Sequence, residues 1–223
     1  MTDSLQSASP RQPRTMSREA RRTQLIESTI ETLAARGYAR TTLTEVARAA
    51  GLSHGLVLFH FETKEKLLAE TLNYLAEEYR QNWQRALAAV GDDPAEQLNA
   101  LIEADYNPAI CTSSRLAAWC SFWGEAQSRP FYQQTCGEKD DAYNRQIEGI
   151  CQRLSDQGGY GRNAGRVARV IRVTIEGTWL DLMTMVSPYQ RDEALATART
   201  CAAMCFPNHF TPEGLNPDRP KAH

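Results

Sequence analysis

The stretch of sequence that decides the fold runs from Thr42 to Lys64 and reads TLTEVARAAGLSHGLVLFHFETK. Thr42, followed three residues later by Glu45, forms a capping box, which predicts the start of a short helix. Gly51 predicts its end, because glycine adopts the positive φ common at helix C-termini, and Ser53 predicts the cap of a second short helix. Two short helices joined by a glycine turn have the form of a helix-turn-helix, whose second helix can enter the major groove of DNA.

The residues that follow predict another helix, capped by Thr63, with Lys64 in its first turn. The helix macrodipole opposes a cation at this position. Lys64 is therefore more stable when a phosphate group lies there and accepts hydrogen bonds from the backbone N–H groups. A helical hairpin in an ordinary all-α core is the alternative interpretation. The position of Lys64 favours a DNA-binding unit.

Charge is unevenly distributed along the 223 residues. The net charge is −2, yet residues 1–66 carry ten Lys/Arg and seven Asp/Glu, whereas residues 67–223 carry fifteen and twenty. A basic N-terminal module on an acidic body fits a local phosphate-binding surface. No apolar run approaches the ~18 residues of a membrane span, and the N-terminus lacks the apolar core of a secretory signal. We therefore expect a cytoplasmic, nucleoid-associated protein with no membrane partner.

The six cysteines do not suggest a metal centre. None forms a Cys-x-x-Cys pair and the chain has four histidines, so we expect no metal site. No nucleophile motif is present either, so we expect no cofactor, no catalytic residue and no enzyme. In a reducing compartment, buried thiols act as small hydrophobic groups. The alternatives are a redox-responsive regulator using Cys111, Cys120 or Cys151 and, with less support, an all-α enzyme.

Helical periodicity and Gly/Pro breaks predict an all-α chain of about nine helices. The first helix should stop at Gly37, and a long helix after Lys64 should run from the DNA-binding unit into the body. A later helix is expected over residues 109–127. Four segments are predicted: a disordered arm (1–15), a three-helix helix-turn-helix domain (16–66), an effector-binding and dimerisation domain (67–206) and a flexible tail (207–223).

Residues 18–68 resemble the helix-turn-helix domain of TetR-type repressors. The residues that carry this resemblance are Gly37, Thr41, Thr42, Val46, Ala47, Ala50, Gly51, Leu52, Ser53, Gly55, His60, Phe61, Lys64, Glu65, Leu67 and Leu68. One position departs from the family pattern. Leu58 stands where a tyrosine that contacts a DNA phosphate is usual, and Phe59 is expected to take part of its place.

The resemblance implies that the two short helices carry the DNA contacts. The hydroxyl groups of Thr42 and Ser53 can reach phosphates as well as cap helices, and His54 and Gly55 lie where a recognition helix approaches base edges. The predicted contact residues are Thr42, Arg48, Ser53, His54, Gly55, Leu58, Phe59, His60 and Lys64.

The C-terminal part resembles the effector domain of BetI-type regulators, which are named for repression of choline-to-betaine genes. The resemblance rests on Ala118–Trp123, Arg129, Pro130, Tyr143, Ile147 and Ile175–Leu180. It implies a homodimer formed through the last two helices and an inducer pocket among the central helices. We therefore expect a repressor that binds a palindromic operator in double-stranded DNA and is released by a small-molecule effector. Activation in place of repression stays open, because the sequence does not reveal the operator position.

Aromatic and acidic residues suggest the chemistry of this effector. The predicted pocket consists of Tyr106, Trp119, Phe122, Trp123, Glu176 and Trp179. Aromatic rings beside a carboxylate bind an amine through cation–π attraction and charge pairing, which suggests a cationic or zwitterionic amine. A core stripe is the alternative interpretation of the rings. An anionic or zwitterionic effector becomes an equal alternative if Arg115, Arg145 or Arg172 enters the pocket.

The last two helices carry apolar faces that can pair with a second copy of the chain. A regulator that reads two half-sites mirrors the two-fold symmetry of its operator, so these faces predict a four-helix dimer interface. Its predicted residues are Val170, Thr174, Thr178, Leu182, Ala198 and Cys201. The alternative is that the same faces close the core of a monomer.

Overall fold

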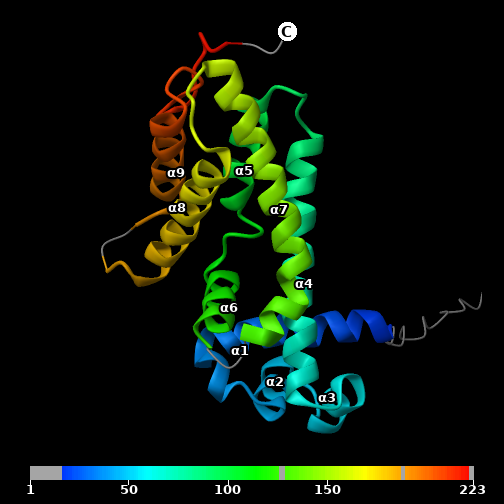
Figure 1. The fold of residues 1–223 in the computed structure, drawn as a ribbon. Coiled ribbons are helices and arrows are strands. Elements are labelled where there is room, and N and C mark those ends of the chain that lie inside the picture. The colour runs from blue at the N-terminus through cyan, green and yellow to red at the C-terminus, as the bar shows by residue number, and fades with distance from the viewer. Residues whose placement is uncertain (1–16, 126–128, 187–188, 221–223) are drawn as a thin grey trace, which may run out of the picture.

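The computed structural model describes residues 17–125, 129–186 and 189–220, so the predicted disordered arm (1–15) lies outside it. Within the described ranges the chain forms nine helices and one short hairpin, which confirms the all-α prediction. The elements are α1 (Arg18–Arg40), α2 (Leu43–Ala50), α3 (His54–Phe61), α4 (Lys64–Ala88), α5 (Pro94–Asp105), α6 (Ser113–Gly124), α7 (Arg129–Gly158), α8 (Ala164–Thr184), α9 (Arg191–Cys205), β1 (Phe210–Thr211) and β2 (Gly214–Leu215). Figure 1 shows α1–α3 at one end and α5, α7, α8 and α9 in an elongated body.

The end of the molecule formed by α1, α2, α3 and the start of α4 surrounds buried apolar side chains. Leu25, Ile30, Val46, Val57 and Phe61 are each at most 2% exposed. Gly37 adopts φ 74° and ψ 171°, so the regular helix stops there as predicted, and the last residues of α1 form a further turn. Glycine meets this conformation without the steric cost that a Cβ adds.

Helix α4 passes from this end into the body, where it lies beside α7 (Figure 1). The Thr63 hydroxyl accepts a hydrogen bond from the Lys66 N–H at 3.2 Å and caps its N-terminus. Leu67 and Leu68 are buried near its start, and Trp83 is buried near its end. One continuous helix therefore contributes to both parts of the molecule.

Helix α6 begins later than the sequence predicts. The Asn107 side chain accepts a hydrogen bond from the Ala109 N–H at 3.0 Å, and the Thr112 hydroxyl accepts one from the Arg115 N–H at 3.2 Å. Side-chain hydrogen bonds of this kind compete with helix formation and favour turns and caps. Residues 109–112 therefore form a turn, and α6 packs on α1.

The C-terminal residues differ from the flexible tail that the sequence predicts from residue 207. Strands β1 and β2 pair antiparallel and pack against α9. His209 and Phe210 are at most 2% exposed, and Arg219 donates to Glu96 at 2.7 Å. Burial of an aromatic ring and a salt bridge to α5 therefore hold residues 207–220 on the body, despite the prolines that suggested a tail.

Candidate DNA-binding face and ligand cavity

Local capping builds the helix-turn-helix as the sequence predicts. The Thr42 hydroxyl accepts from the Glu45 N–H at 3.2 Å, and the Ser53 hydroxyl accepts from the Leu56 N–H at 3.2 Å. Gly51 takes the left-handed conformation, with φ 66° and ψ 32°. Each hydroxyl therefore already has a structural role, and both residues are exposed.

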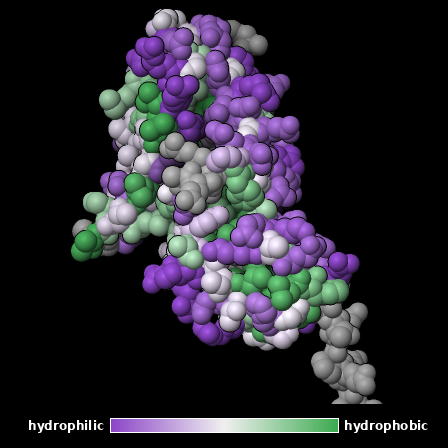
Figure 2. All heavy atoms as spheres, turned by 60° about the horizontal axis from the view of Figure 1, so that its bottom comes forward, coloured by the Kyte–Doolittle hydropathy of each residue, from purple (hydrophilic) through white to green (hydrophobic). Residues whose placement is uncertain are grey.

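Seven of the nine predicted DNA contacts are exposed: Thr42, Arg48, Ser53, His54, Gly55, Leu58 and Phe59. Phe59 is 65% and Leu58 39% exposed, which is unusual for large apolar side chains. Figure 2 shows a hydrophobic patch framed by hydrophilic residues on this end of the molecule. An exposed apolar patch of this kind is typical of a surface that binds a partner.

Lys64 is half-buried and already bonded within the chain. Its ammonium group donates to the carbonyl oxygens of Tyr38 and Ala39, both at 3.2 Å, and lies 5.5 Å from the centre of the Tyr38 ring. These two carbonyl oxygens therefore bind the positively charged ammonium group, for which the sequence analysis predicted a phosphate partner. Lys64 ties the start of α4 to the end of α1.

His60 is half-buried beside arginines of α1. Arg22 donates to the His60 carbonyl at 3.1 Å, and Arg18 lies over the Phe59 ring at 5.6 Å. Burial, followed by the charges of Arg18, Arg22 and Arg21, lowers the pKa of His60. Its imidazole is therefore neutral at neutral pH, and the arginines of α1 supply the positive charge beside α3.

A cavity of about 440 Å³ lies in the body between α4, α6, α7 and α8. Its lining residues are Tyr79, Asp105, Trp119, Trp123, Tyr132, Asp140, Tyr143, Asn144, Arg172, Ile175, Glu176 and Trp179. This volume is in the range of small-molecule sites, which are mostly apolar with a few polar groups.

The aromatic rings form a continuous row along the cavity. Trp123 stacks on Trp119 and on Trp179, with ring centroids 5.9 and 6.5 Å apart. Tyr79 meets Trp179 edge to face at 6.0 Å, and Tyr132 meets Trp119 in the same way at 6.4 Å. The π faces of such rings attract cations.

The described lining residues also include three carboxylates and one guanidinium group. Arg172 donates to Glu176 one turn further along α8. Burial raises the pKa of Asp105 to about 7 and that of Asp140 to about 6. Because Arg172 is paired with Glu176, the ionised cavity has an excess of negative charge, which favours a positively charged ligand.

Four of the six predicted effector residues line this cavity: Trp119, Trp123, Glu176 and Trp179. The prediction is corrected for the other two. Phe122 packs edge to face on Tyr38 of α1, with centroids 5.9 Å apart. Tyr106 is buried, and its hydroxyl shares a 2.6 Å hydrogen bond with that of Thr178. Both rings belong to the core around the cavity.

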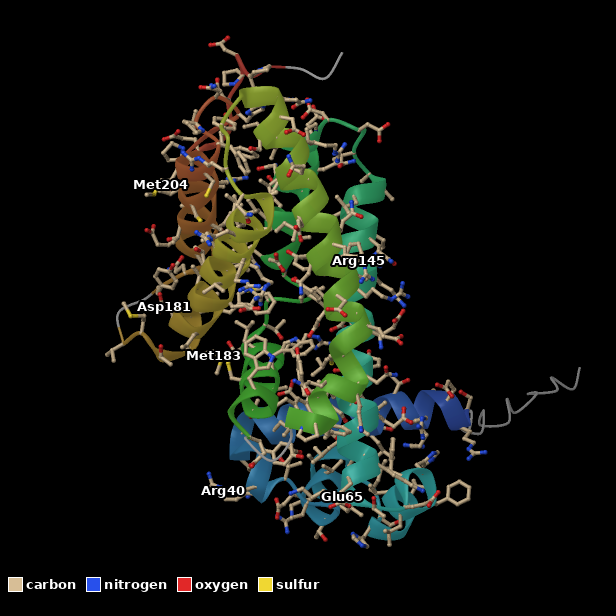
Figure 3. All side chains as sticks on the ribbon, in the orientation of Figure 1. Arg40, Glu65, Arg145, Asp181, Met183 and Met204 are labelled. Atoms are coloured by element: carbon tan, nitrogen blue, oxygen red, sulfur yellow. The ribbon has the colours of Figure 1, made fainter. Side chains whose placement is uncertain are left out.

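Of the three arginines that left the effector charge open, Arg172 alone is among the described lining residues. Arg115 donates to Glu78 at 2.7 Å and to Glu27 at 3.0 Å, so it joins α6 to α4 and α1. Arg145 is exposed on α7 (Figure 3).

The predicted set of pocket residues left out the contributions of α4, α5 and α7 to the cavity, and one residue of α8. The missed residues are Tyr79, Asp105, Tyr132, Asp140, Tyr143, Asn144 and Ile175. A signal was present on α7, where Tyr132, Cys136, Asp140, Tyr143 and Ile147 recur at helical spacing. An aspartate on an otherwise apolar helix face indicates a buried polar site.

The predicted dimer residues fall into two groups. Thr178 and Ala198 are 3% and 0% exposed within one protomer, so the prediction is corrected for them. Thr178 faces Tyr106, and Ala198 is covered where α9 packs on the body. Val170 is exposed, whereas Leu182, Thr174 and Cys201 are half-buried.

The outer face of α8 and α9 exposes further large apolar side chains. They are Val170, Val173, Leu180 and Met183 on α8 and Met204 on α9, each between 38% and 74% exposed. Figure 3 shows Met183 and Met204 on the side of the molecule where α8 and α9 lie, away from α4. A row of this kind is typical of a protein–protein interface.

All six cysteines are free thiols. Burial raises the pKa of Cys111 to about 11 and of Cys151 to about 12, and also raises that of Cys120. The thiolate is the reactive form, so the structure disfavours a redox response at these three positions. Cys201 differs, because the Cys205 thiol donates to it and lowers its pKa.

No helix in the described parts of the chain is long and apolar enough to cross a membrane. The described residues also include no group of three or more His, Cys, Asp or Glu side chains placed to hold a metal ion.

An exposed helix-turn-helix at one end and a helical body around a cavity define the class of a DNA-binding transcription regulator. Comparison with protein families agrees: the bacterial regulatory proteins of the tetR family match residues 25–71, and the BetI-type transcriptional repressor C-terminal domain matches residues 94–207. The chain belongs to the TetR family of transcription regulators, and its C-terminal domain is of the BetI type. The resemblance inferred from the sequence is confirmed.

Relatives support this assignment, and solved structures show the same fold. The HTH-type transcriptional regulator BetI of Paraburkholderia xenovorans is 29% identical over 83% of this chain and 93% of its own length. That of Stenotrophomonas maltophilia is 28% identical over 72% and 80%. The fold is shared with a transcriptional regulator of Pseudomonas aeruginosa PAO1 (TM-score 0.72, 21% identity, 85% and 91% covered). It is also shared with one of Saccharomonospora viridis in complex with choline (TM-score 0.69, 19% identity, 81% and 94% covered).

Proposed function

We propose that this chain is a ligand-responsive repressor that binds a palindromic operator as a homodimer and releases it when a small organic cation enters the cavity. Residues 16–66 would bind DNA, and residues 67–206 would bind the effector and form the dimer. The single observation that carries the proposal is the cavity itself. Among the described lining residues, a row of aromatic rings lies beside three carboxylates, and the one arginine is already paired.

The effector class follows from the chemistry of the lining. Rings of Trp119, Trp123 and Trp179 offer π faces to a cation. Asp105 and Asp140 offer negative charge beside them. A quaternary or protonated amine of the size of choline can contact both the aromatic rings and the carboxylates. The choline bound to the Saccharomonospora viridis regulator supports this choice.

Helix α6 offers a route from the cavity to the DNA-binding end. Its Trp119 and Trp123 line the cavity, while its Phe122 packs on Tyr38 of α1. The backbone carbonyl of Tyr38 in turn accepts a hydrogen bond from Lys64 at the start of α4. A ligand that repacks the tryptophans would shift α6 and thereby the ends of α1 and α4. The ligand shifts the equilibrium only by its preference for the state that does not bind DNA.

The DNA side of the proposal rests on the exposed residues of α2 and α3, with Thr42, Arg48, Ser53, His54, Gly55, Leu58 and Phe59 as contacts. Lys64 and His60 would act mainly by positioning the helices. The apolar row on α8 and α9 would form the dimer interface, which sets the spacing of the two recognition helices.

The decisive experiment combines a selected operator with choline. A randomised duplex pool is enriched on the purified protein, and we expect a palindromic motif. Choline should raise the thermal unfolding temperature of the protein and release the operator in a fluorescence anisotropy titration. If choline and related quaternary amines change neither quantity, the proposed effector class is excluded.

Replacing Trp123 by leucine should weaken choline binding by about tenfold, because a desolvated cation–π contact contributes about 1–2 kcal/mol. Trp123 is 37% exposed, so its loss should cost little stability. The control ligand is the neutral isostere of choline, in which a tert-butyl group replaces trimethylammonium. Its affinity should change much less in a calorimetric titration; an equal loss for both ligands would mean that only packing was removed.

Replacing Gly55 by alanine should stabilise the free protein and weaken operator binding. A Cβ at Gly55 meets no atom within 4 Å, and alanine is favoured over glycine in a helix by up to about 1 kcal/mol. If the bare backbone approaches DNA, the methyl group should lower operator affinity by about tenfold. Gly149→Ala on the exposed face of α7 is the matched control, with stability raised and operator affinity unchanged.

A further inference from the structure

Asp105 occupies an unusual position at the edge of the cavity. It is the last residue of α5 and is 2% exposed. Its Oδ1 accepts from the Tyr79 hydroxyl at 2.8 Å, and its Oδ2 accepts from the Tyr143 hydroxyl at 3.4 Å. No ion pair of the described residues includes Asp105, so this buried carboxylate has only neutral donors. An ionised carboxylate without a cation is costly in such surroundings.

The groups that face Asp105 come from every helix packed around it. They are Tyr79 on α4, Asp140 and Tyr143 on α7, Arg172 and Glu176 on α8, and Tyr106 and Cys111 directly after α5. Towards α9 the charged partner of α5 is Arg199, which pairs with Glu103. Burial raises the pKa of Asp105 to about 7 and Glu176 adds to the effect, while the two tyrosine hydroxyls oppose it.

We propose that Asp105 is the charge partner of the effector's cation, and that the incoming cation displaces a proton from the Asp105 carboxyl group to solvent. This inference rests on the proposed function, because it assigns to Asp105 the preference of the same cavity for a cation over a neutral molecule. The bond that breaks is the carboxyl O–H; the electron pair stays on the carboxylate, and the proton goes to the buffer. The effector is not changed.

The surrounding rings place a bound cation beside this carboxylate. Tyr79 meets Trp179 edge to face, and the Trp179 indole N–H donates to the Asp105 carbonyl at 3.3 Å. Because Tyr79, Trp179 and Asp105 all line the cavity, a cation held by the Trp179 ring shares this cavity with the Asp105 side chain. Two attractions then act together, and the carboxylate gains an ion-pair partner, which none of the described ion pairs gives it.

The other two carboxylates suit this role less well. Glu176 is paired with Arg172. Asp140 is half-buried, and Tyr132 and Arg172 both stabilise its ionised form. Asp105 alone among the three is fully buried, and none of the described ion pairs includes it. Selectivity for a cation over a neutral molecule of the same shape should therefore depend on Asp105.

The test on the wild-type protein compares choline with its tert-butyl isostere at several pH values. Near pH 8 Asp105 is ionised, whereas near pH 6 the cation must displace its proton, so choline affinity should fall about tenfold between them. Affinity for the neutral isostere should not fall. Calorimetry in buffers of different ionisation enthalpy should record proton release with choline near pH 6 to 7 and none with the isostere. Choline binding that is independent of pH and releases no proton would overturn the proposal.

The variant test uses Asp105→Asn, with Asp141→Asn on the exposed face of α7 as the matched control, because Asp141 does not line the cavity. Asparagine retains the shape and can still accept from Tyr79. At about pH 8, Asp105→Asn should weaken choline binding by at least about tenfold, abolish its pH dependence and leave isostere binding intact, whereas Asp141→Asn should change choline affinity by less than about threefold. Equal choline affinity in Asp105→Asn and wild type would overturn the proposal.

Failure of this inference differs from failure of the proposed function. If neither choline nor other amines bind the wild-type protein at any pH, the effector class is wrong. If choline binds and releases DNA but with no pH dependence, the effector class stands and Asp105 is not its charge partner. Thermal unfolding of ligand-free Asp105→Asn establishes that it folds, and the wild-type pH series decides the question if it does not.

Discussion

Replacing Val173 by glutamate is expected to convert the proposed dimer into monomers and to weaken operator binding by at least about 100-fold. Val173 is 51% exposed in the apolar row of α8 and α9, so the protomer should fold normally. In the dimer, the new carboxylate of each protomer would be desolvated and would repel the equivalent carboxylate of the other protomer. Each monomer would then bind one half-site without the gain from simultaneous attachment, which amounts to about 10²–10⁴ in affinity.

Sedimentation velocity measures the oligomeric state, and an anisotropy titration measures operator affinity. Gln133→Glu places the same charge on the exposed surface of α7 and should leave both unchanged. If Val173→Glu remains dimeric and binds the operator as the wild type does, the interface lies elsewhere.

Replacing Arg115 by alanine is expected to lower the free energy of unfolding by about 2 kcal/mol and to weaken the effect of the effector on DNA binding. The Arg115 side chain is 15% exposed, and its guanidinium group bonds Glu78 and Glu27 at distances from 2.7 to 3.0 Å. Its loss leaves two carboxylates without a cation, a cost between that of exposed pairs (about 0–1 kcal/mol) and buried pairs (about 3–5 kcal/mol). It also removes a link from α6 to α1 and α4.

Choline affinity should be nearly unchanged in Arg115→Ala, because this residue does not line the cavity. The choline concentration needed to release the operator should rise severalfold, because α6 is then coupled less strongly to α1 and α4. Arg80→Ala, which breaks a half-buried pair with Glu77 within α4, is the control and should alter neither stability nor coupling by much. Full release at the wild-type choline concentration would exclude Arg115 from the coupling route.

The helix-turn-helix could be predicted because its determinants are local. Thr42, Ser53 and Thr63 cap helices through hydrogen bonds to residues three positions away, and Gly51 ends α2 through its own φ angle. The same locality misled the interpretation of Lys64. Its partners, the carbonyls of Tyr38 and Ala39, are distant in the chain, so the sequence showed the charge and not its acceptors.

The cavity could be predicted only in part. Trp119 and Trp123 were recognised because they lie four residues apart on one helix face, but Phe122 was assigned to the same face and packs on α1. Side chains at neighbouring positions of a helix point about 100° apart. The spacing of residues within one helix does not reveal which other helix packs on each of its faces. Thr178 and Ala198 were misplaced for the same reason, since a buried small residue and an interface residue have the same pattern.

By itself the sequence determined the helical class, the DNA-reading unit at Thr42–Lys64 and the family, because caps, turns and helix periodicity depend on contacts within a few residues. Only the tertiary structure decided that α4 and α7 complete the cavity, that Asp105 is buried between Tyr79 and Tyr143, and that Lys64 is held by α1. The physical reason is that burial depends on how the helices pack. Burial in turn sets the protonation state and the partners of an ionisable side chain. No single helix contains the neighbours that set it.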